Sequence, residues 1–239
     1  MNLGLKGKIA FVTGGAHGIG QAITRALLAE GCWVTITTRD PEARAAMEAE
    51  GAAVILTDLD GRFPIPDADI LVNNAGSTLG IQDPYCSTEE LRRVMRLNFE
   101  IPREIANRCI PRMKEKGWGR IVNITSCSGV ENRGPVTFCC AKAALTAYTK
   151  SMGRVLAIQS PNVVMSAIYP GVVYTKGGHW DKILKEKPEH WENYRKEIPV
   201  GRFGRVEEIA TAVVYQCSEQ ASFSHGAIIG CDGGLTKGY

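Results

Sequence analysis

Lys142 and Phe138 lie four residues apart in the segment VTFCCAKAAL, which covers residues 136–145. The segment reads as the start of an amphipathic helix, so the two side chains share one helix face. Because a glycine-rich nucleotide signature lies upstream, we expect an acid or a base beside this lysine. A phenyl ring can be neither, so the role of Phe138 is the main question that the sequence raises.

The nucleotide signature is TGGAHGIG at residues 13–20, between a predicted strand and a predicted helix. Gly14, Gly18 and Gly20, with Ile19 between the last two, permit a tight turn and close approach of the backbone to a pyrophosphate. The helix N-terminus supplies amide donors and partial positive charge. The spacing differs from the general GxGxxG fingerprint, and a purely structural turn could use the same residues. The strand before and the helix after favour a dinucleotide site.

The end of the second predicted strand indicates which nicotinamide cofactor fits. An NAD site has an acidic residue there for the ribose 2′-hydroxyl, whereas an arginine accommodates the 2′-phosphate of NADP. This chain has Thr37, Thr38 and Arg39, followed by Asp40, which suits the N-cap of the next helix. Arg39 could also be a solvated charge at the strand end, but the pattern favours NADP over NAD. His17 in the glycine loop is a second candidate contact for the 2′-phosphate.

Strand and helix patterns alternate along the whole chain. The predicted strands are KIAFVTGG, WVTITTRD, AAVILTDL, DILVNNAG, GRIVNITS, VVMSAIYPG and the short GAIIGCDGG. The predicted helices are IGQAITRALLAE, PEARAAMEAE, TEELRRVMRLNFEIPREIANRCIPRMKEK, CCAKAALTAYTKSMGRVLAI and VEEIATAVVYQCSE. This order predicts an α/β fold: one Rossmann-like, doubly wound parallel sheet of about seven strands with helices on both faces, in a single domain over residues 1–239. The segment DGRFPIPDA is too short and proline-rich for a helical crossover, so we expect an extended loop there.

Composition excludes several classes of protein. The net charge of +3 is too small to indicate nucleic-acid binding, and no apolar run approaches the roughly 20 residues that a membrane span needs. The eight cysteines form no CxxC pair, which argues against a zinc site and a disulfide framework. We therefore expect a cytoplasmic protein without a metal.

Several motifs in order closely resemble the short-chain dehydrogenase/reductase family. They are TGGAHGIG, NNAG at 73–76, Asn98 in RLNFE, IVNITS, the Lys142 helix and YPG at 169–171. The resemblance covers nearly the whole chain. It implies hydride transfer between a nicotinamide and a carbonyl or secondary alcohol.

The resemblance also assigns catalytic roles. Ser126 would hold the substrate oxygen, although Thr125 beside it is a rival. Lys142 would bind the nicotinamide ribose and lower the pKa of a tyrosine acid four residues before it. Asn98 would anchor a water that relays protons to Lys142. The family tyrosine falls on Phe138.

Further cofactor contacts follow from the same resemblance. On the adenine–ribose side they are Asp58, Asn73, Asn74, Ala75 and Gly76. Near the nicotinamide they are Pro170, Gly171, Val173 and Thr175.

Three interpretations of Phe138 remain open: an engineered Tyr→Phe change, a naturally inactive relative, or a replacement proton donor. Tyr148 lies ten residues further along the helix, roughly 15 Å along its axis, which is too far to substitute. Tyr169 lies near the Pro-Gly turn, but its strand position favours packing. Losing a positioned general acid costs about 10²–10⁴-fold in rate, so this chain should be nearly silent. A catalytically silent NADP-binding regulatory module is the alternative function.

The segment from about 172 to 204 follows the last cofactor motif, where a lid over the substrate is expected. It carries His179, Trp180, Trp191 and Tyr194 among many charges. Aromatic rings stack well on sugars, so a sugar or another polar small molecule is a compatible substrate. A solvated helical pair with core tryptophans explains the segment equally well. The resemblance further implies a homotetramer or homodimer built on the two long helices.

Overall fold

Seven parallel strands form one sheet, in the order β3-β2-β1-β4-β5-β6-β7, in the computed structural model, which describes residues 1–238. The strands are β1 (Ile9–Val12), β2 (Trp33–Thr38), β3 (Ala53–Leu56), β4 (Ile70–Asn73), β5 (Gly119–Ile124), β6 (Val163–Pro170) and β7 (Ile228–Cys231). All neighbouring strands pair in parallel. The predicted Rossmann-like fold class is confirmed.

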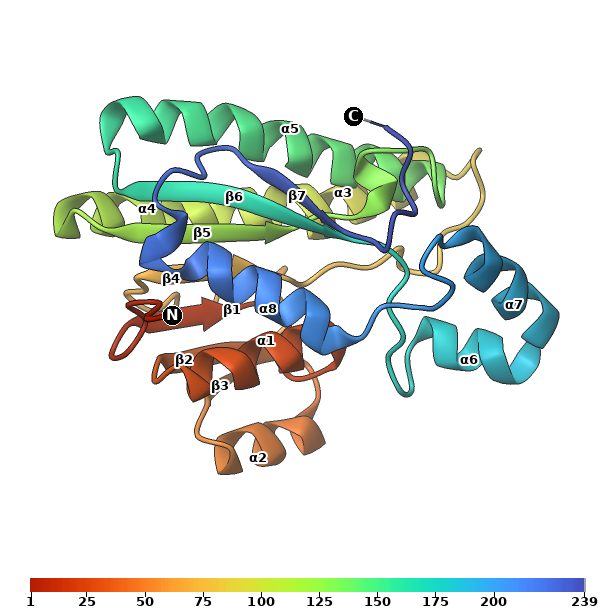
Figure 1. Ribbon diagram of the computed structural model, residues 1–239, viewed down its shortest axis with the longest axis horizontal. Helices are drawn as coiled ribbons and strands as arrows, with labels where there is room; N and C mark the ends of the chain where they lie inside the picture. Colours follow the sequence, from red (N-terminus) through yellow and green to blue (C-terminus); the bar gives the residue numbers. More distant parts are fainter. Residues whose placement is uncertain (239) are drawn as a thin grey trace.

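Helices connect the strands on both faces of the sheet (Figure 1). They are α1 (Gly18–Ala29), α2 (Pro41–Ala49), α3 (Thr88–Met95), α4 (Ile101–Lys116), α5 (Val136–Gln159), α6 (His179–Glu186), α7 (Pro188–Glu197) and α8 (Val206–Cys217). Shorter helical turns are η1 (Arg96–Glu100), η2 (Cys127–Gly129) and η3 (Glu219–Ala221). As predicted, the chain between β3 and β4 forms no helix. No helix of the described residues is both long and apolar enough to cross a bilayer.

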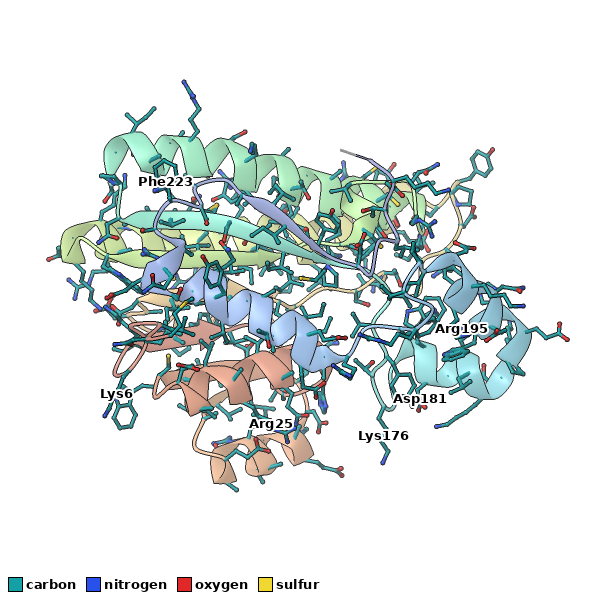
Figure 2. The ribbon with its side chains drawn as sticks, in the orientation of Figure 1. Lys6, Arg25, Lys176, Asp181, Arg195 and Phe223 are labelled. Carbon is teal, nitrogen blue, oxygen red and sulfur yellow. The ribbon has the colours of Figure 1, made fainter. Side chains whose placement is uncertain are left out.

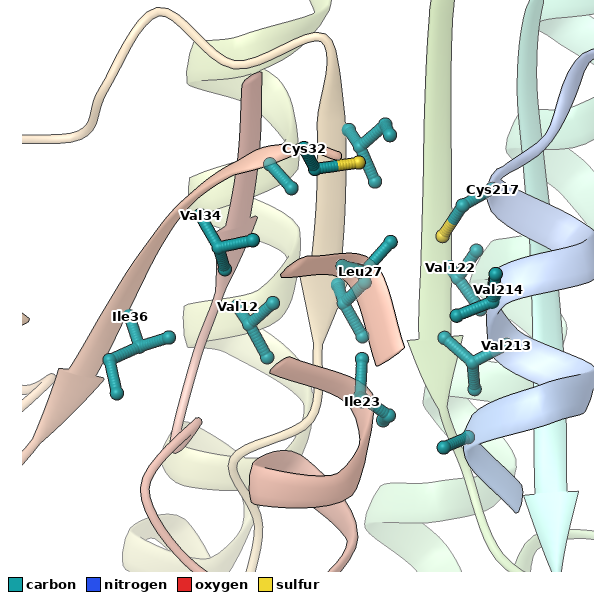
Figure 3. Packing of buried hydrophobic residues seen from close by; sticks show 14 of the residues in the cluster. Val12, Ile23, Leu27, Cys32, Val34, Ile36, Val122, Val213, Val214 and Cys217 are labelled. Carbon is teal, nitrogen blue, oxygen red and sulfur yellow. The ribbon is translucent and has the colours of Figure 1, made fainter. Parts of the chain in front are cut away.

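Alternate strand residues supply two separate cores, because successive side chains of a strand point to opposite faces. Val12 packs with α1 and α8, where Ile23 and Val213 are also fully buried (Figure 3). Phe11, its neighbour in β1, packs on the other side with residues of α4 and α5. These two cores hold the sheet rigid, so the ends of its strands can position a site.

The long helix predicted over residues 88–116 is interrupted by η1, a π-helical turn. The turn lies between α3 and α4, and the backbone stays helical through it, because the residues at its two ends, Met95 and Ile101, are themselves in the α conformation. Asn98 lies within this turn and is fully buried. π-Helical turns often occur at functional positions, and here the turn carries one of the predicted catalytic residues.

Candidate functional site

A cavity of about 910 Å³ lies at the carboxyl ends of the strands, and it includes the point where the strand order reverses between β1 and β4. Chains leave these two strands in opposite directions, which creates a crevice for ligands. The predicted site residues that line it are Gly14, His17, Gly18, Ile19, Gly20, Arg39, Asp58, Asn74, Ala75, Gly76, Ser126, Phe138, Lys142, Pro170, Gly171, Val173 and Thr175. Asn98 lies behind the cavity wall. The structure therefore brings together residues that are far apart in the sequence.

Hydrogen bonds join the glycine loop, which follows β1, to the ends of β2 and β4, the strands on either side of β1. The Asn74 side chain donates to the carbonyl oxygens of Thr13 and Gly14 at 3.0 and 3.1 Å. The Gly14 amide in turn donates to the hydroxyl of Thr37 at 3.0 Å. A Cβ on Gly20 would lie 2.1 Å from the Gly14 carbonyl oxygen, so only glycine fits there. The loop is thus held in one conformation by the chain's own bonds.

The first turn of α1 faces the cavity with its amides uncapped by side chains. His17 occupies the N-cap position, but its side chain forms no capping hydrogen bond, and the first turn contains no acidic residue. Uncapped amides together with the helix dipole form a binding site for anions such as phosphate. Gly18 and Gly20 line the cavity without side chains. These features fit the pyrophosphate of a dinucleotide.

Two basic residues lie near the end of β2: Arg39, which follows the strand, and His17 of the glycine loop. Asp40 caps α2, accepting from the amides of Glu42 and Ala43, as predicted. Its other oxygen lies 2.9 Å from Nε2 of His17. The two capping amides hold the pKa of Asp40 below its usual range, with a smaller contribution from His17. The Arg39 side chain is mostly exposed, and its ion pair with Asp58 is long, at 3.9 Å. The guanidinium can therefore turn toward an anion in the cavity.

Lys142 is buried at the base of the cavity. Its Nζ donates to the carbonyl oxygen of Ile124, at the end of β5, at 2.8 Å. Burial lowers the pKa of this ammonium to about 8, because an apolar environment disfavours the charged form. With this pKa the amine can gain or lose a proton near neutral pH, as a group that takes part in proton transfer must.

Phe138 shares this end of the cavity with Lys142, as the helix spacing predicts. Nζ of Lys142 lies 5.6 Å from the centroid of the Phe138 ring, within the range of a cation–π contact. The half-buried ring lines the cavity and also packs in an apolar cluster with Ile81 and Val94. The side chain that faces the lysine thus provides packing and no proton.

Neither tyrosine considered as a replacement acid lines the cavity among the described residues. The hydroxyl of Tyr148 donates to Asn107, and its ring packs edge-on against Phe99. Tyr169 lies within β6 with its hydroxyl 3.5 Å from that of Thr236. These positions agree with the predictions that Tyr148 is too far along its helix to act and that Tyr169 packs within its strand.

Ser126 and Thr125 both line the cavity, but their hydroxyls differ in what they bind. The hydroxyl of Thr125 donates to the Ile168 carbonyl oxygen across the sheet, and the residue is buried. The hydroxyl oxygen of Ser126 accepts from the amide of Ser128 at 3.1 Å. The Ser126 hydroxyl itself donates only to the sulfur of Cys127, at 3.9 Å, and sulfur is a weak acceptor, so a substrate oxygen can replace it. The Thr125 proton is bound to a backbone carbonyl oxygen instead.

Asn98 supports the chain beside Lys142. Its side-chain amide donates to the carbonyl oxygens of Ser77 and Val94, at 2.8 and 2.9 Å, and its oxygen accepts from the Ser77 amide. A Cβ on Gly76 would lie 2.7 Å from Oδ1 of Asn98 and 3.0 Å from Nζ of Lys142. Asn98 and Lys142 therefore flank the same glycine, close to one another.

The expectation that Asn73 contacts the cofactor is wrong. Asn73 is the last residue of β4, and its side chain is buried, donating to Asn123 and to the Pro102 carbonyl oxygen. Because successive side chains of a strand point to opposite faces of the sheet, that of Asn73 points toward α4. Conversely, the sequence analysis did not assign cofactor contacts to Ser77, Lys176 or Trp180, which also line the cavity. For Lys176 and Trp180 the sequence did contain a signal: the glycine pair between them, in TKGGHW, indicates a tight turn that could bring both residues to the cavity.

The segment after β6 forms two short helices, α6 and α7, which project from one end of the molecule (Figure 1). An aromatic cluster holds them against the chain before α8: Trp180 lies 5.1 Å and Trp191 4.7 Å from the ring of Phe203, centroid to centroid. Trp180 also packs against Tyr194 and lines the cavity. Trp180 thus belongs both to the core of the helical pair and to the cavity wall, whereas Trp191 belongs to the core alone.

Asp181 fastens the start of this segment. Its carboxylate accepts from the hydroxyl of Tyr174, the amide of Gly177 and Nζ of Lys185, all within 2.7–2.9 Å. The Lys185 ammonium, with Tyr174 and the amide, holds the pKa of this carboxyl well below its usual range. Three donors on one carboxylate restrain the turn before α6.

Replacing Asp181 with asparagine should loosen this turn. The amide keeps the size of the side chain but removes the charge that attracts Lys185, so trypsin should cleave at lysines of α6 about five-fold faster. Mass spectrometry of timed digests measures the rate. Glu186→Gln is the matched control, since the pair that Glu186 forms with Lys182 is exposed. Equal cleavage of the two variants would contradict a restraining role for Asp181.

Two family models match the chain. One, described as short chain dehydrogenase, matches residues 8–62, and the other, described as enoyl-(acyl carrier protein) reductase, matches residues 61–236. A 3-oxoacyl-(acyl-carrier-protein) reductase from Aquifex aeolicus is 34% identical, covering 98% of this chain and 100% of that protein. A 2-dehydro-3-deoxy-L-rhamnonate dehydrogenase (NAD(+)) from Sphingomonas is 33% identical, covering 96% of each.

Solved structures resemble the whole chain. A 3-oxoacyl (acyl-carrier-protein) reductase from Agrobacterium tumefaciens with NADP bound is 28% identical with a TM-score of 0.86, covering 97% of this chain and 95% of that one. L-Sorbose reductase from Gluconobacter frateurii, complexed with NADPH and L-sorbose, is 26% identical with a TM-score of 0.87, covering 100% of both. Similar proteins thus include both acyl-group and sugar enzymes.

Proposed function

The chain belongs to the short-chain dehydrogenase/reductase family of oxidoreductases, and we propose that it binds NADP and is built to interconvert a carbonyl and a secondary alcohol. The observation that carries this proposal is the cavity itself: it joins a fastened glycine loop, uncapped amides, an exposed arginine, a serine hydroxyl and a buried lysine. Together these groups fit hydride transfer between a nicotinamide and a carbonyl. Position 138 sets how much of the reaction this chain performs.

The residues around the glycine loop would hold the cofactor. The amides at the start of α1 and the glycines Gly14, Gly18 and Gly20 suit the pyrophosphate. Arg39 and His17 suit a 2′-phosphate. When bound, NADP supplies or accepts a hydride at C4 of its nicotinamide. The NADP and NADPH present in similar structures support this choice, although one relative is named for NAD(+).

The other end of the cavity would hold the substrate oxygen. Ser126 donates its proton to that oxygen and so orients the carbonyl. Lys142 holds the ribose and, in its charged form, favours an ionised phenol beside it. Asn98 fixes the chain around Gly76 and could hold a water next to Lys142. Phe138 occupies the place from which a tyrosine would protonate the substrate oxygen, so we propose that this chain is a Tyr-to-Phe inactivated form.

A catalytically silent NADP-binding module is the second candidate. The packing of Phe138 against Ile81 and Val94 favours it, because a ring that belongs to an apolar cluster needs no catalytic role. Under this alternative the site reports cofactor binding to a partner without turnover. Restoring tyrosine at position 138 separates the two candidates.

Arg39→Gln should distinguish NADP from NAD as the cofactor. Removing one charge-assisted contact to the 2′-phosphate should weaken NADPH binding about ten-fold and leave NADH binding unchanged. Titrations followed by nicotinamide fluorescence measure both dissociation constants. Arg44→Gln is the matched control, because Arg44 lies on α2 and pairs with Glu48 away from the cavity. An unchanged NADPH affinity in Arg39→Gln would remove the basis for choosing NADP.

We propose a polar carbonyl compound, such as a keto sugar, as the substrate. The ring of Trp180 on the cavity wall supports this choice, since aromatic faces pack well against sugar rings. The similarity to L-sorbose reductase points the same way. We further propose that residues 1–239 act as one domain with a lid at about 172–204, in a homodimer or homotetramer formed through α4 and α5. Exposed apolar residues on α5, such as Val155 and Ile158, support such an interface.

A further inference from the structure

The segment between β6 and α6 lies directly against the start of α1. A Cβ on Gly18, the first residue of α1, would lie 3.1 Å from Cγ2 of Thr175. The chain then turns tightly: the amide of Gly178 donates to the carbonyl oxygen of Thr175 at 3.0 Å, and Gly177 has a φ of 74°. Residues 175–178 therefore form a turn, which we call the lid stem, beside the amides proposed to receive the pyrophosphate.

Lys176 is the cation of the lid stem. It lines the same cavity as Gly18 and His17, and Figure 2 shows its side chain extending from the stem, clear of the ribbon. Nearby lysines of the lid are paired, Lys182 with Glu186 and Lys185 with Asp181. Within residues 1–238, Lys176 forms no such ion pair. Its charge is thus available to a ligand.

Asp181 limits where Lys176 can go. The carboxylate accepts from the Gly177 amide at 2.9 Å, one residue after Lys176, and from Tyr174 on the other side of the stem. Its third bond, to Lys185, ties the stem to α6. The backbone of Lys176 is therefore fixed beside α1, while its long side chain remains free to turn.

We propose that Lys176 binds the pyrophosphate of the dinucleotide and so links cofactor binding to the lid. This inference rests on the proposed function. The start of α1 provides amides and a partial positive charge but no full charge. A lysine acts as a mobile point charge toward phosphate. Because the stem continues into α6, a phosphate held by Lys176 would also hold the lid near the cavity.

The test compares the dissociation constants of NADPH and NADH for the unchanged chain, Lys176→Gln and Lys182→Gln. Lys176→Gln should weaken both cofactors about ten-fold, because both contain the pyrophosphate and lose one charge-assisted contact. Raising the ionic strength should weaken the unchanged chain more than this variant, since less charge remains to be screened. Lys182→Gln is the matched control and should bind both cofactors normally, because Lys182 does not line the cavity.

The outcomes separate the two proposals. If the unchanged chain binds neither cofactor, the proposed function fails and this inference fails with it. If the unchanged chain binds and Lys176→Gln binds equally well, this inference alone is overturned. A loss confined to NADPH would also overturn it, because that result assigns Lys176 to the 2′-phosphate.

Discussion

Phe138→Tyr should raise the rate of carbonyl reduction by about 10²–10⁴-fold, the usual contribution of a positioned general acid. The half-buried ring already lines the cavity beside Lys142, so a hydroxyl can be added without moving the helix. The buried ammonium favours ionisation of that hydroxyl and brings the pKa of the phenol toward the working range. The assay follows NADPH oxidation with a panel of keto sugars, other ketones and acyl thioesters.

The control for this gain is the double variant Phe138→Tyr with Ser126→Ala. If the tyrosine acts as the acid on an oxygen held by Ser126, removal of that hydroxyl should cancel most of the gain. Turnover by the unchanged chain would contradict the claim that Phe138 deprives it of an acid. NADPH binding without turnover in either protein, across the panel, would favour the regulatory module.

Lys142→Met should make the protein more stable, by about 2 kcal/mol near pH 7. Burial lowers the pKa of Lys142 from an ordinary value of 10.5 to about 8, which penalises the charged form by about 3 kcal/mol. Loss of the hydrogen bond to Ile124 costs about 1 kcal/mol in return. Urea denaturation at several pH values measures the difference.

The pH dependence gives this prediction its sign. Between about pH 8 and 10.5 the unfolded chain holds a proton on Lys142 that the folded chain has lost, so rising pH stabilises the folded state. The advantage of Lys142→Met should therefore be full below about pH 8 and disappear toward pH 10.5. Lys150→Met, at an exposed position of the same helix, should show no such trend. A stability difference independent of pH would contradict a desolvated ammonium at position 142.

Local patterns were sufficient to predict most of the fold, and the family resemblance supplied most residues of the candidate site. Strands and helices alternate with clear periodicity, and the glycine loop, Ser126 and Lys142 lie at strand ends or on a helix face whose direction follows from that order. Since parallel strands share one carboxyl edge, residues at successive strand ends had to converge. The Asp40 cap could also be predicted, because a helix cap depends only on residues close to it in the sequence.

The remaining features depend on contacts that sequence periodicity does not encode. Strand β4 ends at Asn73, so the side chain of Asn73 stays in the sheet while that of Asn74 reaches the cavity. A strand end shifted by one residue would exchange their places, and the sequence does not fix the end that closely. The π-helical turn at Asn98 leaves the apolar pattern unbroken, so the sequence predicted a continuous helix. The place of Lys176 depends on the tertiary path of the chain after β6, which brings it back to α1.

The bonds that fasten the glycine loop have a consequence for the kinetics of ligand capture. Thr37 and Asn74 already fix the loop from both sides, so a dinucleotide meets a rigid receptor at its phosphates and loses little time to backbone rearrangement. If α6 and α7 form the proposed lid, their movement is then the slow step. Association should be governed by diffusion and residence time by the opening of those helices, which makes the two rates separately adjustable.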